Sequence, residues 1–102
     1  MASERLRAAL GPLDLASPLI AASGTVGTVW EWAQVADTSV FGAGVAKSVA
    51  PEPWPGRPAP RLAPLPTGMI NGIGIQNPGI DEWSRENARR IAGAGVPVWG
   101  SA

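Results

Sequence analysis

Three residue types are missing from this sequence of 102 residues: it contains no cysteine, no histidine and no tyrosine. Without cysteine and histidine, these residues cannot form disulfides, zinc sites with thiolate or imidazole ligands, or Cys–His and Ser–His–Asp nucleophilic centres. Chemistry in this stretch has to come from carboxylates, from a lysine, or from a bound cofactor that brings its own reactivity. We expect no metal site.

Charge is also scarce. Charged residues make up 16% of the chain and apolar residues 45%, and the formal net charge is zero with no basic run. This composition predicts a folded globular domain and argues against a nucleic-acid or anionic-membrane surface. No apolar run approaches the length of about 18 residues that indicates a spanning helix, and the charged start MASERLRAALG does not resemble a signal peptide. We expect a cytoplasmic protein with no nucleic-acid or membrane partner.

Lysine occurs once. Seven of the eight basic residues are arginines, and Lys47 is the exception. It lies in GAGVAKSVA, at the end of an apolar run that is typical of a buried strand. A lysine at a strand end can be a simple surface residue, but its compact charge also suits a ligand site where arginine would not fit. Taken alone, Lys47 is compatible with either role.

Apolar runs and helix signals alternate along the chain. Residues 12–22 predict two short extended pieces, and residues 41–50 predict a strand buried on both faces. Between them, residues 28–31 fit a capping box that opens a helix ending near Asp37.

A second helix is predicted over residues 81–92, with Asp81 as its N-cap and with Gly93 and Gly95 as its stop signal. VPVWGSA, residues 96–102, then begins a further apolar strand. Strands that alternate with helices indicate a parallel α/β sheet. Three such strands leave sheet edges without partners, so we expect these residues to be the front of a larger domain.

Residues 51–66, PEPWPGRPAPRLAPLP, contain seven prolines. Such a segment can be a stiff linker or a peptide ligand of an SH3-type domain. The single PxxP pair, Pro55 to Pro58, is a poor ligand motif because Pro60 stands where a following basic residue would help. We predict a long ordered loop, a kind of segment that often carries function.

Polar residues follow the predicted strands at equivalent places. ASGT follows the first core strand, AKS ends the second, and the glycine-rich GMINGIGIQNPGID precedes the second helix. In a (β/α)8 barrel, ligands are held where the strands end, so Ser23, Gly24, Lys47 and Ser48 would face one mouth. The glycine-rich stretch alone is more typical of a turn, although glycine also lets backbone approach a ligand closely.

Four segments, PLIAASGT, VAKSV, PGRPAPR and GMINGIGIQNPGID, occur in this order and spacing. Together they resemble the N-terminal part of the dihydroorotate dehydrogenases, FMN-dependent (β/α)8 barrel enzymes that oxidise dihydroorotate to orotate in pyrimidine synthesis. The resemblance covers residues 12–102, and NGIGIQNPG is most similar to the class 1 enzymes linked to NAD. It implies an α/β fold in which residues 1–102 form the N-terminal portion of a flavin-binding TIM barrel, about three βα units.

The resemblance also implies roles for particular residues. The FMN contacts would be Ala22, Ser23, Gly24, Lys47 and Ser48. An ammonium fixed near the flavin would stabilise the negative charge of the reduced cofactor and pair with the orotate carboxylate.

The substrate contacts implied by the resemblance would be Lys47, Asn71, Gly72, Ile73, Gly74 and Ile75. The amide of Asn71 can both donate and accept hydrogen bonds to the pyrimidine. Two departures accompany this assignment. Arg57 stands where the family usually has asparagine in the proline loop. The family's catalytic base, a cysteine or serine on a later loop, would lie beyond residue 102, so no catalytic residue is assigned here.

The resemblance further implies an iron–sulfur and FAD-containing electron-transfer subunit as a partner, and a homo-oligomer for the full-length protein. Two alternatives stay open. One is a barrel of the dihydropyrimidine dehydrogenase type, which acts on uracil-like rings. The other is a catalytically inactive truncated piece or interaction module, suggested by the missing base and the short last strand.

Overall fold

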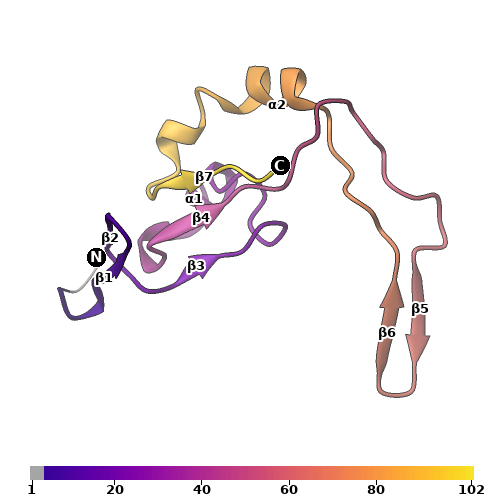
Figure 1. Ribbon diagram of the computed structural model, residues 1–102, viewed down its shortest axis with the longest axis horizontal. Helices are drawn as coiled ribbons and strands as arrows, with labels where there is room; N and C mark the ends of the chain where they lie inside the picture. The colour runs from indigo at the N-terminus through magenta and orange to yellow at the C-terminus, as the bar shows by residue number, and fades with distance from the viewer. Residues whose placement is uncertain (1–3) are drawn as a thin grey trace.

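A three-stranded parallel sheet lies at the centre of the structure, a computed structural model that describes residues 4–102. Its strand order is β3–β4–β7, with β3 at Ile20–Ala21, β4 at Ala43–Val45 and β7 at Val98–Trp99 (Figure 1). Both pairings are parallel. The predicted parallel α/β arrangement is confirmed, and the strand that leads to Lys47 is the central one. These strands form no closed barrel.

Small residues allow close packing against the central strand. Val29 is only 1% exposed and lies directly over Gly44 of β4. The buried cluster around it is apolar and is lined by larger, partly buried side chains; it comprises Ala21, Val26, Val29 and Ala94, with Trp30, Phe41, Val96 and Val98 packed against it. Burial of this apolar surface is what holds the helical segments on the sheet.

The first helix is shorter than predicted. Helix α1 spans Trp30–Ala33, and a 3-10 turn, η2, follows at Thr38–Val40. The Glu31 carboxylate accepts a hydrogen bond of 3.0 Å from the Thr28 amide, which confirms one half of the predicted capping box. The helix does not continue toward Asp37. Val35 is 79% exposed, so a further turn would gain no packing to stabilise it.

The second helix begins one residue earlier and ends sooner than predicted. Helix α2 spans Ile80–Asn87, and Gly79, with φ of 83°, precedes it. Asp81 is therefore not the N-cap; it lies in the first turn, where its negative charge still suits the helix dipole. Beyond Asn87 the chain tightens into 3-10 geometry, with η3 at Ile91–Gly93.

The side chain of Asn87 links the two helices. It is 5% exposed, accepts a hydrogen bond of 2.8 Å from Trp30 Nε1 and donates one of 2.9 Å to the Trp83 carbonyl. Both polar atoms of this buried side chain thus have a hydrogen-bond partner.

A long two-limbed ribbon leaves the sheet after β4. The proline-rich segment runs outward into β5, Leu62–Leu65, and the chain returns through β6, Gly68–Asn71, which pairs antiparallel with β5. Figure 1 shows this hairpin extending away from the sheet. The radius of gyration is 16.0 Å, against about 13 Å for a compact domain of this length. Residues 51–61 form a long loop, as predicted for the proline-rich segment. The hairpin of β5 and β6 that follows was not predicted.

The N-terminal part adds a small second hairpin. A 3-10 turn, η1, at Glu4–Leu6 leads into β1, Ala8–Leu10, which pairs antiparallel with β2, Leu13–Leu15. Arg7 forms ion pairs with Asp14 and Glu4 beside it. Across residues 4–102, no helix combines the length and apolar character needed to span a bilayer.

The contact between Val29 and Gly44 makes a direct prediction about stability. A Cβ at Gly44 would lie 2.6 Å from Val29 Cγ2, so Gly44→Ala should destabilise the full-length protein by about 1–3 kcal/mol through overpacking. Gly93→Ala is the matched control, because nothing lies within 4 Å of a Cβ there. Urea unfolding measures both variants. Equal stability of the two would contradict the packing described here.

Candidate functional site

Three serine hydroxyls form a row where the three parallel strands end. Ser23 follows β3, Ser48 follows β4 and Ser101 follows β7. Ser23 Oγ lies 3.3 Å from Ser48 Oγ, and Ser48 Oγ lies 2.6 Å from Ser101 Oγ. Ser23 Oγ also donates to the Ala46 carbonyl at 3.0 Å. The parallel sheet thus brings side chains from distant parts of the sequence to one edge.

Backbone hydrogen bonds between the chain after β4 and the chain after β7 fix two members of this row, Ser48 and Ser101. Beyond the last paired residues, the Ala46 amide donates to the Trp99 carbonyl at 2.9 Å, and the Val49 amide donates to the Ser101 carbonyl at 3.0 Å. These bonds extend the β4–β7 ladder past Ser48. The backbone positions of Ser48 and Ser101 are therefore set by the sheet, whereas Ser23 lies in the turn after β3 and is joined to them through its side chain.

Lys47 lies beside this row and is half-buried. Its amide donates to the Gly27 carbonyl at 2.9 Å, which ties the end of β4 to the loop after β3. A Cβ on Gly24 would lie 4.0 Å from Lys47 Cδ, so the lysine stem passes over that glycine. Gly24 has φ of 84°, a conformation that favours glycine. The structure therefore brings Ser23, Gly24, Lys47 and Ser48 together, with Ala22 exposed next to them.

The other predicted residues, 71–75, lie in the returning limb of the ribbon. Asn71 is exposed at the end of β6, paired with Leu62, and within residues 4–102 its side chain makes no hydrogen bond. Strand alternation places Asn71 and Met69 on the same face of the hairpin. Asn71 is not brought into contact with Lys47.

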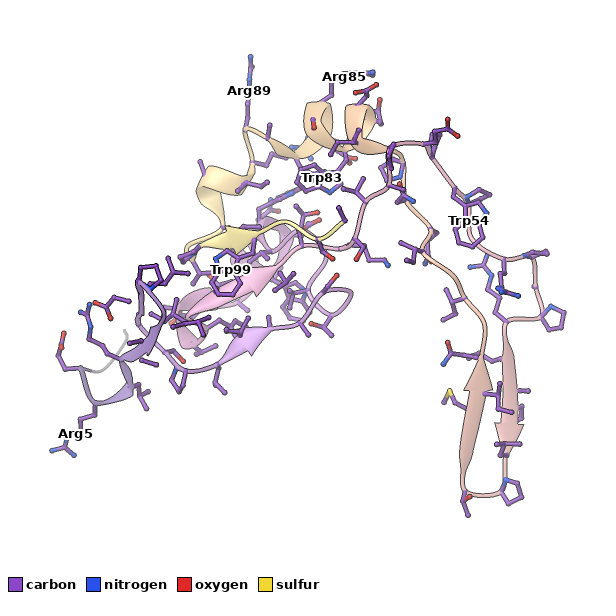
Figure 2. All side chains as sticks on the ribbon, in the orientation of Figure 1. Arg5, Trp54, Trp83, Arg85, Arg89 and Trp99 are labelled. Carbon is purple, nitrogen blue, oxygen red and sulfur yellow. The ribbon has the colours of Figure 1, made fainter. Side chains whose placement is uncertain are left out.

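The glycines of the returning limb accommodate the outgoing limb. Trp54 projects from the proline-rich limb (Figure 2), and its ring approaches Gly74 so closely that a Cβ would lie 2.4 Å from Trp54 Cη2. Gly74 also has φ of 81°. At Gly72, a Cβ would have the Arg57 side chain as its nearest neighbour, at 3.6 Å. The structure therefore gives Gly74 a packing role against Trp54.

Two cavities join the strand ends to the base of the ribbon. One, of about 320 Å³, is mostly apolar and has Ser48 on one side and Trp54 and Ile75 on the other. A second, of about 180 Å³, is more polar and is bordered by Lys47, Ser48 and Trp83. Trp83 Nε1 is buried without a hydrogen-bond partner among the described residues. Ser48 thus lines both spaces.

Asn77 fastens the ribbon to the sheet. Its Oδ1 accepts hydrogen bonds from the Ala50 amide at 3.1 Å and the Gly79 amide at 2.9 Å, and its Nδ2 donates to the Ile75 carbonyl at 2.9 Å. Its backbone also exchanges two hydrogen bonds with Trp54, of 2.9 and 2.8 Å. Asn77 was not predicted as a site residue, although Asn before Pro-Gly is a turn signal visible in the sequence.

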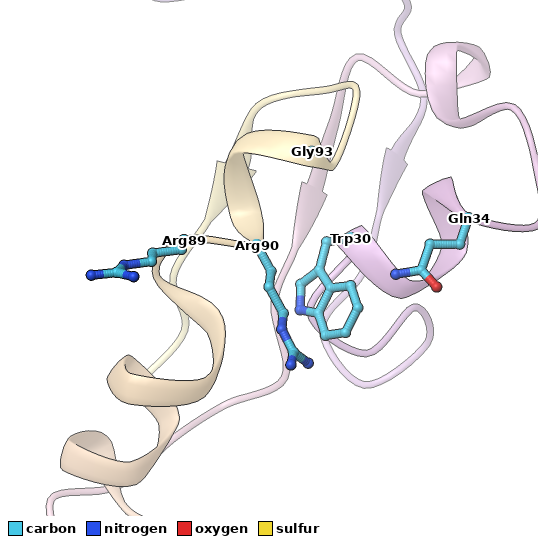
Figure 3. A pocket seen from close by; sticks show the side chains of 5 residues that line it. All are labelled: Trp30, Gln34, Arg89, Arg90 and Gly93. Atoms are coloured by element: carbon cyan, nitrogen blue, oxygen red, sulfur yellow. The ribbon is translucent and has the colours of Figure 1, made fainter.

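A larger hollow on the outer surface lies apart from these groups. It is bordered by α1 and η3, and in it the Arg90 guanidinium stacks 4.8 Å from the Trp30 ring centroid while Arg89 points away (Figure 3). The Arg90–Trp30 pair is a cation–π contact between the two helical segments. Within the described part of the chain, no cluster of carboxylates could hold a metal ion.

The chain matches the family profile described as "Dihydroorotate dehydrogenase" over residues 5–98. The chain belongs to the dihydroorotate dehydrogenase family. The resemblance drawn from the four ordered motifs is confirmed. The family profile spans the serine row as far as Ser48, together with Lys47 and the whole ribbon.

The similar curated proteins that we compared all carry the same name. The chain is 41% identical over 83 residues to the "Dihydroorotate dehydrogenase B (NAD(+)), catalytic subunit" of Alkaliphilus metalliredigens, covering 81% of this chain and 28% of the relative. The protein of the same name from Fusobacterium nucleatum is 40% identical over 96 residues, covering 94% and 32%. That from Bacillus cereus is 46% identical over 78 residues, covering 76% and 25%. The chain therefore spans about 30% of the length of these relatives.

The hydrogen bonds of Asn77 predict how the ribbon responds to mutation. Asn77→Ala removes three side-chain hydrogen bonds, so we expect a local loss of about 1–2 kcal/mol and a roughly 5- to 30-fold faster proteolytic cleavage within residues 51–77. Asn77→Asp keeps the acceptor oxygen and should lie between this variant and the wild type. Limited proteolysis of the full-length protein, followed by mass spectrometry, measures the cleavage. Identical rates for all three proteins would rule out this anchoring role.

Proposed function

We propose that this chain supplies one wall of the FMN and substrate site of an enzyme that oxidises dihydroorotate to orotate in pyrimidine biosynthesis, as the N-terminal part of a flavin-binding TIM barrel. The observation that carries the proposal is the convergence of Ser23, Lys47 and Ser48 at the ends of adjacent parallel strands, in a chain of the dihydroorotate dehydrogenase family.

The residues at this edge suit a flavin. A flavin needs an apolar surface for its rings, hydrogen-bonding groups for its polar edge and no bulky side chain where backbone approaches it. The apolar cavity beside Ser48, the serine hydroxyls and the left-handed Gly24 offer these features. In this proposal Ala22, Ser23, Gly24, Lys47 and Ser48 hold FMN, which when bound supplies the hydride-accepting ring.

Lys47 is the positively charged side chain among the proposed FMN and substrate contacts. Its backbone is fixed by the hydrogen bond from its amide to the Gly27 carbonyl, and its stem passes over Gly24, where no side chain stands in its way. A held ammonium stabilises negative charge that develops beside it and pairs with a carboxylate of the substrate. A guanidinium is larger and planar, which is why the single lysine in a chain of arginines matters here.

The ribbon supplies the substrate contacts. Asn71 to Ile75 bind the pyrimidine, with the Asn71 amide free to donate and accept. Ile75 already shares a cavity with Ser48. Because Asn71 lies further out along the exposed hairpin, its contact with substrate depends on parts of the barrel outside these residues.

Oxidation of the ring removes two hydrogens: one leaves with its electron pair as hydride, the neighbouring carbon gives up a proton, and a carbon–carbon double bond forms. The proton requires a positioned base. None of residues 4–102 is assigned this role, and we place the base elsewhere in the full-length protein. The relatives' name, a catalytic subunit of an NAD(+)-linked enzyme, supports the presence of a partner subunit. In our proposal this partner is an iron–sulfur and FAD-containing electron-transfer subunit, and we expect the full-length protein to be a homo-oligomer and cytoplasmic.

Substitution of Lys47 tests the proposal. In the full-length protein, Lys47→Ala should slow FMN reduction by dihydroorotate about 100-fold or more, because the charge beside the ring and the carboxylate partner are both lost. Lys47→Arg should restore little of the rate. Anaerobic stopped-flow absorbance of the flavin measures the reduction.

Arg85→Ala is the control, since Arg85 is exposed on α2 and pairs only with Glu82 in the described structure. Dihydrouracil, which lacks the carboxylate, is the comparison substrate. A wild-type protein that oxidises dihydrouracil faster than dihydroorotate would favour the dihydropyrimidine dehydrogenase type. Wild-type rates in Lys47→Ala would refute the assignment of Lys47.

A further inference from the structure

Trp54 is a large apolar side chain that the proposed function leaves without a role. It lies between Pro53 and Pro55, and a proline restricts both its own backbone and that of the residue before it. The Trp54 amide donates to the Asn77 carbonyl at 2.9 Å, and the Asn77 amide donates to the Trp54 carbonyl at 2.8 Å. The backbone of Trp54 is therefore fixed at the base of the ribbon.

The ring of Trp54 is restricted as well. One end of it covers Gly74, where a Cβ would lie 2.4 Å from Trp54 Cη2 and 2.6 Å from Trp54 Cζ3. Trp54 is nevertheless 43% exposed, and it borders the cavity of about 320 Å³ at the strand ends. A ring that is held at one end and bare at the other offers a preformed apolar surface to a ligand.

The cavity beside this ring is apolar. Across the described residues, none of those that line it is charged; Val49 and Ile75 belong to its walls, and Ser48 supplies a hydroxyl. Lys47 instead borders the more polar cavity of about 180 Å³, which also reaches Ser48. A single ligand in contact with Ser48 can therefore place an apolar end in one cavity and a polar end near Lys47.

The ring system of a flavin has two such ends. Its pyrimidine end carries carbonyl and N–H groups, whereas its dimethylbenzene end consists of carbon and hydrogen alone. The substrate carboxylate is excluded from the uncharged cavity, because burial of an unpaired carboxylate is costly. We infer that Trp54 is a further FMN contact, which packs against the dimethylbenzene end and so determines which way round the ring system lies. The inference rests on the proposed function.

Removal of the indole tests this contact. In the full-length protein, Trp54→Ala should raise the dissociation constant of FMN about 5- to 20-fold, because buried apolar area and an aromatic pair are lost. Trp54→Phe keeps an aromatic ring and should bind FMN within about threefold of wild type. Trp32→Ala is the matched control, since Trp32 is 48% exposed on α1 and borders neither cavity. Fluorescence titration of each apoprotein with FMN gives the dissociation constants.

A second measurement separates ligand contact from damage to the ribbon, because Trp54→Ala also uncovers Gly74. A synthetic FMN analogue without the two ring methyl groups should bind wild type about 3- to 15-fold more weakly than FMN, in line with the burial of two methyl groups. In Trp54→Ala, the two flavins should bind within about twofold of each other. A loosened ribbon would weaken both flavins equally and leave the effect of the methyl groups unchanged.

Three results would overturn the inference. FMN could bind Trp54→Ala as tightly as Trp32→Ala, which would mean that parts of the protein outside residues 4–102 fill the cavity. The methyl groups could matter equally in wild type and in Trp54→Ala, which would leave Trp54 only its packing over Gly74. The loss could be confined to orotate, titrated against the FMN-loaded protein, which would assign the cavity to the substrate.

All three results leave the proposed function standing. A wild-type protein that binds no FMN would instead refute the proposed function and, with it, the role of Trp54.

Discussion

The parallel pairing of β4 with both β3 and β7 is the constraint on which the rest of the structure depends. Parallel strands end at the same edge of a sheet, so residues separated by more than 20 positions in the chain are brought within hydrogen-bond distance of one another. Gly44 makes this possible, because its missing side chain lets Val29 cover the centre of the sheet. The core and the candidate site therefore depend on the same short strand: Gly44 of β4 lies in the core, and Lys47 and Ser48 follow directly after β4.

Hydrogen bonds keep the chain segments after β4 and β7 aligned beyond the ends of these strands. The ladder between β4 and β7 continues to Val49 and Ser101, and Asn77 then joins the chain after β4 to the start of α2. Two cavities lie where these connections meet, and Ser48 borders both. A single hydroxyl position thus adjoins an apolar space and a charged one, a combination that suits a ligand with both a ring system and polar edges.

Much of the fold could be predicted because it depends on local patterns. The apolar run before Lys47 indicated the buried central strand, and Thr28 to Glu31 indicated the start of α1. Helix ends were less predictable, because they depend on tertiary contacts. Helix α1 ends where its next turn would lie in solvent. Helix α2 ends at Asn87, whose side chain accepts a hydrogen bond from Trp30 Nε1. The hairpin of β5 and β6 was missed because prolines and glycines concealed its short apolar strands. Ser23, Lys47 and Ser48 were found from motifs, whereas Ser101 required three-dimensional distances.

The close contact between Val29 and Gly44 also has an evolutionary meaning. Val29 has φ of 72°, unusual for a β-branched residue, and is held there by burial over the glycine. The two positions share one volume, so a larger residue at 44 requires a smaller one at 29. Sequences that diverge from this one should therefore change the two positions together or keep both, although one lies before α1 and the other in β4.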